Sequence, residues 1–258
     1  GASLNLLTDA VSQEASAEVT NSVGSFSTFR HNLQFSTGLL QDRVEIAGRL
    51  SKITSDGYID RATSDLKSYF LQASYLDETT LVKAITFGGA EVTYQSWNGI
   101  DKETLEQDRT FNSAGMFTDE LGNVQFYDNE VDDYRQDHYQ LHWNERYNNR
   151  WSSNIVLNYT YGRGFFEQYK EDEDFEDYGF TPIDLGEESI NTTDLIRRRW
   201  LDNDYYVVNT NLNYKKSGME VTSGAFYSQY AGKHFGEVIW ARFASDSEIR
   251  DRYYESDA

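Results

Sequence analysis

Aromatic side chains in or beside long acidic segments are the residues of this sequence best suited to contact a ligand. Flat rings on exposed loops offer contact surface to small molecules and sugars. The same rings also pack loops against their neighbours, and that second interpretation stays open for each of them. Eight residues form the candidate ligand-binding set: Tyr94, Trp97, Phe126, Tyr127, Tyr134, Trp200, His234 and Trp240.

The acidic run Glu171–Asp177 offers carboxylate oxygens, which are the ligands that calcium prefers. It does not fit the calcium-loop pattern, because Asp177 occupies the position that needs glycine when Asp172 is the first ligand. On a strand, His138 and His142 would lie about 13 Å apart, too far to share one metal ion. We therefore expect a solvated acidic surface, no metal site and no cofactor.

Three consecutive arginines, Arg197–Arg199, suit an anionic ligand or lipid phosphates, or they act as a rim anchor; we favour the rim anchor. Catalysis is not predicted. No nucleophile, base and orienting group stand out, and Gly162–Gly164 lacks the glycine spacing and lysine of a nucleotide site. We expect that the protein is not an enzyme.

The charge of the chain is strongly negative and unevenly distributed. The net charge is −20, which argues against a nucleic-acid partner. Residues 95–137 hold eleven acidic and three basic side chains, and residues 163–204 hold thirteen and five. We therefore expect the charge in two long loops. There is no cysteine to form a disulfide, and no run of about 18 apolar residues predicts a transmembrane helix.

The elements that would position these residues are β-strands, because apolar side chains recur at every second position. In Tyr139–Asn144 and Trp151–Tyr161 the aromatic and aliphatic residues share one face, and amides and hydroxyls share the other. The six polar residues between them suit a hairpin turn. Similar alternation predicts nine strands in all: 17–23, 29–39, 44–51, 68–75, 81–93, 139–144, 151–161, 205–214 and 219–230.

The connections and the aromatic spacing favour a transmembrane β-barrel. Short turns follow the second, fourth, sixth and eighth strands, and longer loops follow the third, fifth, seventh and ninth, the last beginning near Gly236. Tyr206 and Tyr214 lie eight residues apart, or roughly 20 Å of height in a tilted strand, near the apolar band of such barrels. We expect an all-β, antiparallel up-and-down barrel that is incomplete, with long extracellular loops.

Several stretches resemble those of a known family. They are Gly1–Leu6, Leu50–Ala62, Thr93–Ile100, Asp133–Tyr139 and Gly162–Lys170. Across essentially its whole length the chain resembles a TonB-dependent outer-membrane receptor. The resemblance implies that residues 1–16 are the end of the plug domain with its linker, and that residues 17–258 are the N-terminal part of the barrel. The stretches are loop and strand-end signatures, so they indicate the family better than the cargo.

The family resemblance also implies partners and a location. It implies a barrel of about 22 strands in the outer membrane of a Gram-negative bacterium. It further implies import of a siderophore, haem, cobalamin or glycan, a periplasmic energy-coupling protein that acts through the plug, and contact with outer-membrane lipid; a surface lipoprotein is a further candidate partner. The start at Gly1 has no signal-peptide pattern, and we expect a piece of a longer protein.

Two other classes stay open. The first is a soluble or surface-anchored β-rich module that binds a glycan. A soluble sandwich would bury its apolar face and would not need aromatic residues at both ends of it, as in the pairs Tyr206/Tyr214 and Trp151/Tyr161. The second is a passive porin, which predicts no plug remnant at residues 1–6.

Overall fold

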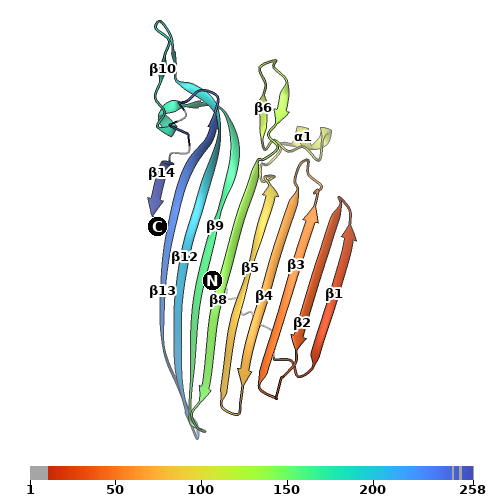
Figure 1. Cartoon of the computed structure of the whole chain (residues 1–258), viewed down its shortest axis with the longest axis vertical. Helices are drawn as coiled ribbons and strands as arrows, with labels where there is room; N and C mark the ends of the chain where they lie inside the picture. Colours follow the sequence, from red (N-terminus) through yellow and green to blue (C-terminus); the bar gives the residue numbers. More distant parts are fainter. Residues whose placement is uncertain (1–10, 246, 250–251, 258) are drawn as a thin grey trace.

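The protein forms one large antiparallel sheet, seen in a computed structural model that describes residues 11–245, 247–249 and 252–257 (Figure 1). Ten strands follow one another up and down in the order β1-β2-β3-β4-β5-β8-β9-β12-β13-β14. Their bounds are β1 Ala15–Gly24, β2 Thr28–Thr37, β3 Val44–Ser55, β4 Ser64–Leu76, β5 Thr80–Tyr94, β8 Val131–Arg146, β9 Trp151–Asp174, β12 Thr192–Lys216, β13 Met219–Ala241 and β14 Arg252–Asp257. The predicted all-β, up-and-down architecture is confirmed.

The small elements lie in the connections at the upper end of the sheet in Figure 1. The connection from β5 to β8 holds the short helix α1 and the hairpin β6–β7, and the one from β9 to β12 holds the 3-10 turn η1 and the hairpin β10–β11. Their bounds are α1 Lys102–Gln107, β6 Met116–Thr118, β7 Val124–Phe126, η1 Phe175–Tyr178, β10 Ile183–Asp184 and β11 Ser189–Ile190. Longer connections thus gather at one end of the sheet and short turns at the other, as the sequence predicts.

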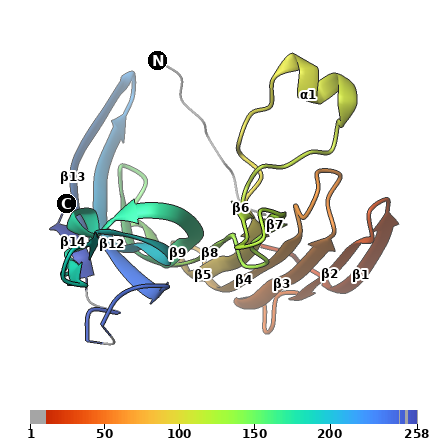
Figure 2. The ribbon, with the colours of Figure 1, turned by 90° about the horizontal axis from the view of Figure 1, so that it is seen from above.

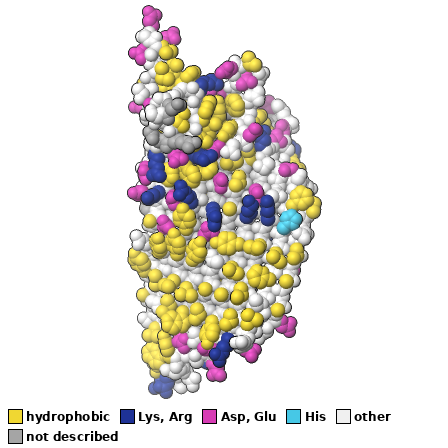
Figure 3. Space-filling model, viewed as in Figure 1, with side chains coloured by type: hydrophobic (Ala, Val, Ile, Leu, Met, Phe, Trp, Pro, Cys, Tyr) yellow, Lys and Arg dark blue, Asp and Glu magenta, His cyan; other side chains and the backbone are white. Residues whose placement is uncertain are grey.

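The alternation of side chains gives the sheet two different faces. We call the face of Leu141, Leu157 and Val208 the outer face; these residues lie side by side in register and are each about 40% exposed. Figure 3 shows that face, with hydrophobic side chains in a broad band over the lower half of the molecule. Aromatic side chains lie at both margins of the band. The ring centroids of Tyr159 and Tyr206 are 5.0 Å apart near its top, and those of Trp151 and Tyr214 are 4.7 Å apart at its base.

The opposite, inner face is lined by amides, hydroxyls and histidines that satisfy one another. Gln140 Nε2 donates to Asn158 Oδ1 over 3.1 Å, and the other amide oxygen, Gln140 Oε1, is 3.0 Å from His142 Nε2. His138 Nδ1 lies 2.8 Å from Thr160 Oγ1. Seen from above, the sheet curves into an open trough, with α1 above its concave side (Figure 2). The sheet is not closed, since β1 and β14 form its two edges.

None of the helices in the described parts of the chain is long and apolar enough to cross a membrane.

Four strands are far longer than the sequence indicates. One is β8, which begins at Val131, inside the loop expected over residues 95–137. β9, β12 and β13 have 24, 25 and 23 residues and rise above the other strands. The loops expected over residues 163–204 and from Gly236 are therefore wrong, and residues 175–191 are the connection between β9 and β12. The expectation of nine strands is corrected by β14, which pairs with β13 at Lys233–Glu237. Alternation fails as a signal above the band because both faces there carry charged and aromatic residues.

A small hydrophobic core stabilises this upper extension. Phe175 and Tyr178 of η1, with Phe180 after it, pack on Leu195 and Val238, and all five are at least nine-tenths buried. Leu195 is completely buried. The upper parts of the long strands are thus stabilised by a hydrophobic core of their own, above the ends of the shorter strands.

Candidate functional site

The eight candidate residues lie at the upper end of the sheet but divide between its two faces. Trp97, Tyr134 and His234 belong to the inner side, where the ring of Trp97 lies edge-on to Phe166 at 6.1 Å. Tyr127, Trp200 and Trp240 belong to the outer side, and Tyr94 and Phe126 lie at the base of the loop between β5 and β8. Tyr134, Trp200, His234 and Trp240 are in strands, which corrects their expected position in loops.

Tyr94 and Phe126 hold the β5–β8 connection in place. The Tyr94 hydroxyl donates to the carbonyl of Tyr127 over 2.8 Å and lies 3.1 Å from that of Ala114. The guanidinium of Arg61 stacks on Phe126 at 3.6 Å from the ring centroid and donates to the Asn112 carbonyl. Since Tyr94 is only 5% exposed, these two aromatic residues pack the loop and offer little surface to a ligand.

Trp200 is the centre of an aromatic cluster on the outer face. Its ring lies 4.6 Å from that of Phe165 and 5.8 Å from that of Phe235, and its indole nitrogen donates to Glu237 over 3.1 Å. The guanidiniums of Arg163 and Arg252 stack on Trp200 and Phe235 at 5.1 and 3.8 Å. Trp200 therefore faces away from the concave side, and it packs β9, β12 and β13 together.

Glu167 is a buried anionic centre beside this cluster. It is 1% exposed and accepts hydrogen bonds from the Tyr127 hydroxyl at 2.5 Å and from Asn129 Nδ2 at 2.6 Å. Arg198 Nε donates to its other oxygen over 2.6 Å. Burial, together with the hydrogen bond to Glu167, raises the pKa of Tyr127 above its usual range. Tyr127 is thus a fixed neutral donor that ties the β5–β8 connection to β9.

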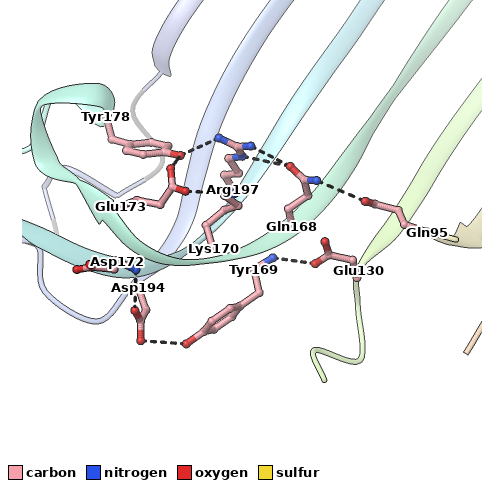
Figure 4. A network of polar contacts seen from close by, with 10 residues as sticks. All are labelled: Gln95, Glu130, Gln168, Tyr169, Lys170, Asp172, Glu173, Tyr178, Asp194 and Arg197. Atoms are coloured by element: carbon pink, nitrogen blue, oxygen red, sulfur yellow. Dashed lines mark hydrogen bonds and ion pairs between the residues drawn. The ribbon is translucent and has the colours of Figure 1, made fainter. Parts of the chain in front are cut away.

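On the inner side, Arg197 organises a polar network (Figure 4). Its guanidinium donates to Gln168 Oε1 over 3.0 and 3.3 Å and to the Tyr178 hydroxyl over 2.8 Å. Tyr178 donates in turn to Glu173, whose other oxygen lies 3.2 Å from Lys170 Nζ. Burial, with the hydrogen bond to Glu173, raises the pKa of Tyr178. The network joins the upper parts of β9 and β12 to η1 through hydrogen bonds.

Arg199 is the inner cation best placed for a ligand. Its guanidinium lies 5.9 Å from the Phe166 ring centroid and 5.3 Å from that of Tyr254, within range of cation–π attraction. A hydrogen bond with Tyr254 raises its pKa, so the group is a permanent positive charge. In the described ranges no carboxylate forms an ion pair with Arg199. A positive charge flanked by Phe166 and Tyr254, with Trp97 beside Phe166, suits an anionic ligand with flat groups.

The three arginines therefore do not act as one unit. Arg198 lies on the outer face in an ion pair with Glu167, whereas Arg197 and Arg199 lie on the inner face. The strand alternation counted from Tyr206 places them this way, so that signal was available in the sequence. Phe166 and Tyr254 were not among the candidates; Tyr254 reaches Arg199 from β14, a strand that the sequence did not predict.

The acidic run forms strand and turn contacts. Glu171 Oε1 accepts the backbone N–H of Thr118 over 2.8 Å, and Glu173 contacts Lys170 and Tyr178. Over residues 11–245, 247–249 and 252–257, no cluster of three or more His, Asp or Glu side chains is arranged to hold a metal ion.

Comparison with known proteins gives a likeness of fold. No protein-family model and no curated protein matches the sequence. Among solved structures, the chain is similar to the closed form of Fiu, the TonB-dependent ferric-catecholate import receptor of Escherichia coli K12, with a TM-score of 0.50. The match covers 88% of this chain at 10% sequence identity, and the chain spans only 39% of the receptor. The chain thus has the fold of part of the β-barrel of a TonB-dependent receptor.

Proposed function

We propose that this chain is part of the barrel wall and extracellular mouth of a TonB-dependent outer-membrane receptor that imports a scarce nutrient. The observation that carries the proposal is the two-faced sheet, with apolar side chains exposed on the outer face and hydrogen-bonded polar groups on the inner face. Lipid covers such an outer face, and a plugged, watery lumen suits such an inner face. The fold likeness to a transport receptor supports import rather than catalysis.

Residues 1–16 would enter the barrel from the plug. Residues 1–10 lie outside the described part of the chain. Ser12, which follows them, donates its backbone N–H to Glu45 over 3.0 Å, and Glu45 lies on the inner face near the short turns. This contact supports a chain that reaches β1 from inside the barrel at its periplasmic end. The energy-coupling protein would act through that plug, and a surface lipoprotein would meet the long loops.

We favour an anionic metal chelate of the siderophore class as the ligand. Arg199 presents a positive charge between Phe166 and Tyr254, and Trp97, which is 57% exposed, extends the aromatic surface. Haem, cobalamin and glycans are the other nutrients of the class, and an uncharged glycan would gain least from the arginine. In this mechanism the ligand meets the upper inner face, the β5–β8 connection closes over it, and the plug is then displaced.

Expression of the complete gene and fractionation of the cells test the membrane location. We expect the protein in the outer-membrane fraction and, after extraction, a monodisperse sheet-rich particle only in detergent. A cooperative, monodisperse β-protein in plain buffer would contradict the proposal and favour the glycan-binding module.

Substitution of Arg199 tests the ligand class in the same full-length protein. Arg199→Gln should weaken binding of an iron-loaded tricatecholate about tenfold or more, because the positive charge between the two aromatic rings is lost. Arg199→Lys keeps the charge and should keep part of the affinity. Arg163→Gln, which removes an arginine from the outer face, is the matched control and should bind normally. Equal binding by the Arg199 and Arg163 variants would contradict this ligand site.

A further inference from the structure

A single row of basic residues crosses the outer face above the apolar band. We call Lys52, Lys67, Arg135, Arg163 and Lys233 the basic row. Lys52 is the register partner of Lys67, and Arg135 is that of Arg163. Ala90 lies between Lys67 and Arg135, and Asp202 lies between Arg163 and Lys233. In Figure 3 basic side chains gather directly above the hydrophobic band. In a chain of net charge −20, five cations in one register row need an explanation.

The carboxylates beside the row do not account for it. Asp65 lies 3.6 Å from Lys52 and 3.7 Å from Lys67, so one acid serves two lysines. Asp137 pairs with Arg135 over 2.8 Å, and Asp202 lies 3.6 Å from Arg163. Lys52 and Lys67 are 48% and 61% exposed and Asp65 is 41% exposed, and exposed pairs of this kind contribute little free energy. Arg135 is itself 67% exposed, although the carboxylate of its partner Asp137 is buried. The two lysines are therefore free to exchange Asp65 for a stronger anion, and Arg135 has further N–H donors besides the one that contacts Asp137.

A hollow in the outer face lies within the same row. It has a volume of about 470 Å³ and opens between Lys67 and Arg135, where Ala90 contributes only a methyl group. Leu33, Leu50 and Tyr69 line its apolar part, and the Tyr69 hydroxyl donates to Asp137 over 2.7 Å. The hollow thus joins a cationic upper margin to an apolar lower part, the arrangement that a phosphorylated headgroup with acyl chains requires.

We propose that the basic row and its hollow bind the phosphate groups of an anionic lipid in the outer leaflet of the membrane. The inference rests on the proposed function, because only a membrane-spanning wall brings lipid to this height. Lysine and arginine bind phosphate oxygens by charge-assisted hydrogen bonds, and the acyl chains continue downward over Leu33 and Leu50. The row would fix the height of the wall in the membrane on the side of the long loops.

The test uses the full-length protein in detergent, titrated with diphosphorylated lipid A and followed by native mass spectrometry. We expect the wild type to bind this lipid about tenfold or more tightly than the same lipid without phosphates, because each basic group at a membrane surface favours anionic lipid. The triple variant Lys52→Gln, Lys67→Gln, Arg135→Gln should lose that preference. Inorganic phosphate at the same concentration should not compete, because it lacks the acyl chains.

A matched control removes three cations from the short turns at the opposite end. The variant Arg150→Gln, Lys215→Gln, Lys216→Gln should keep the wild-type preference, and Lys52→Arg, Lys67→Arg should keep it as well. Equal binding of both lipids by the wild type, or equal losses in the two triple variants, would overturn the proposal. If the protein is instead recovered from the aqueous fraction, the proposed function itself fails, and this inference fails with it.

Discussion

The two halves of the sheet share one pattern but differ in what lies above it. Strands β1–β5 have 10 to 15 residues and end near the top of the apolar band, whereas β9, β12 and β13 have 23 to 25 and continue upward. Above the band the long strands carry a buried ion pair, a hydrophobic core and the inner cation Arg199. The short-strand half carries exposed ion pairs and the hollow.

This difference separates two tasks of the wall. In the proposed barrel wall, lipid and lumen would each contact every second residue of the lower part, which therefore needs only alternation. The extension would lie above the lipid, and its shape depends on packing and on buried charges that are hydrogen-bonded. Disruption of the extension should therefore change stability strongly, while matched changes in the short-strand half should change it little.

The largest effect is expected from loss of the buried carboxylate of the extension. Glu167→Ala leaves Arg198, Tyr127 and Asn129 without their acceptor and should cost about 3–5 kcal/mol of local stability. Hydrogen exchange of the upper β9 and β12 amides measures it. Glu167→Gln keeps an acceptor, so its stability should lie between those of the wild type and the alanine variant. A change below 1 kcal/mol for the alanine variant would contradict the role given to this residue.

Truncation in the core of the extension should have the next largest effect. Leu195 is fully buried against Phe175, so Leu195→Ala should cost about 3 kcal/mol. Leu50→Ala in the short-strand half removes the same atoms from a side chain that is 54% exposed, and should cost under 1 kcal/mol in detergent. Thermal unfolding of both variants compares them directly; equal shifts would remove the distinction between the two halves.

The connection that joins the halves offers a more local prediction. Gly115 has φ +70°, and a Cβ there would lie 2.5 Å from the Tyr94 hydroxyl oxygen. Gly115→Ala should therefore release the β5–β8 loop at a cost of about 1–3 kcal/mol. Gly122→Ala is the matched control, since Gly122 has φ +80° but open space around it. Limited proteolysis should cut the loop faster in the Gly115 variant than in the control.

A pH-dependent contact of the extension should have a smaller effect. Hydrogen bonds from the backbones of Ser245 and Thr181 lower the pKa of Glu248 from 4.5 to about 2. Because the folded-state pKa is lowered, the contribution is present above pH 4.5 and is lost as the pH falls toward 2. Exchange of the Thr181 amide, corrected for intrinsic rates, should accelerate over that window. Glu248→Gln should show no such step.

The sequence predicted the part of the fold that alternation governs. The Tyr139–Tyr161 hairpin, the polarity of the two faces and the grouping of short turns agree with the structure, because one face is apolar and the other polar throughout the band. Above Tyr161 that contrast ends: Arg163 and Glu167 lie on the same face as Phe165. The periodic signal disappears there although the strand continues, and so the strand ends were misplaced.

The candidate site was predictable only in part for a related reason. Alternation along β12 separates Trp200 from Arg199, so the division between faces was accessible from the sequence. The contact between Arg199 and Tyr254 was not, since it joins residues 55 positions apart through a strand that forms only by pairing with β13. Tertiary pairing, rather than local pattern, assembles the cation and its aromatic neighbours.

The smallest change in stability is expected where the short-strand half meets the basic row. Asp65→Asn removes the carboxylate shared by Lys52 and Lys67, an exposed pair, and should alter stability by under about 1 kcal/mol. The same substitution frees two cations, so affinity for a diphosphorylated lipid should rise. For this one variant, thermal unfolding measures the change in stability and lipid titration measures the change in lipid affinity. A large loss of stability would place Asp65 with the buried charges of the extension, and a fall in lipid affinity would mean that it orients the lysines rather than competing for them.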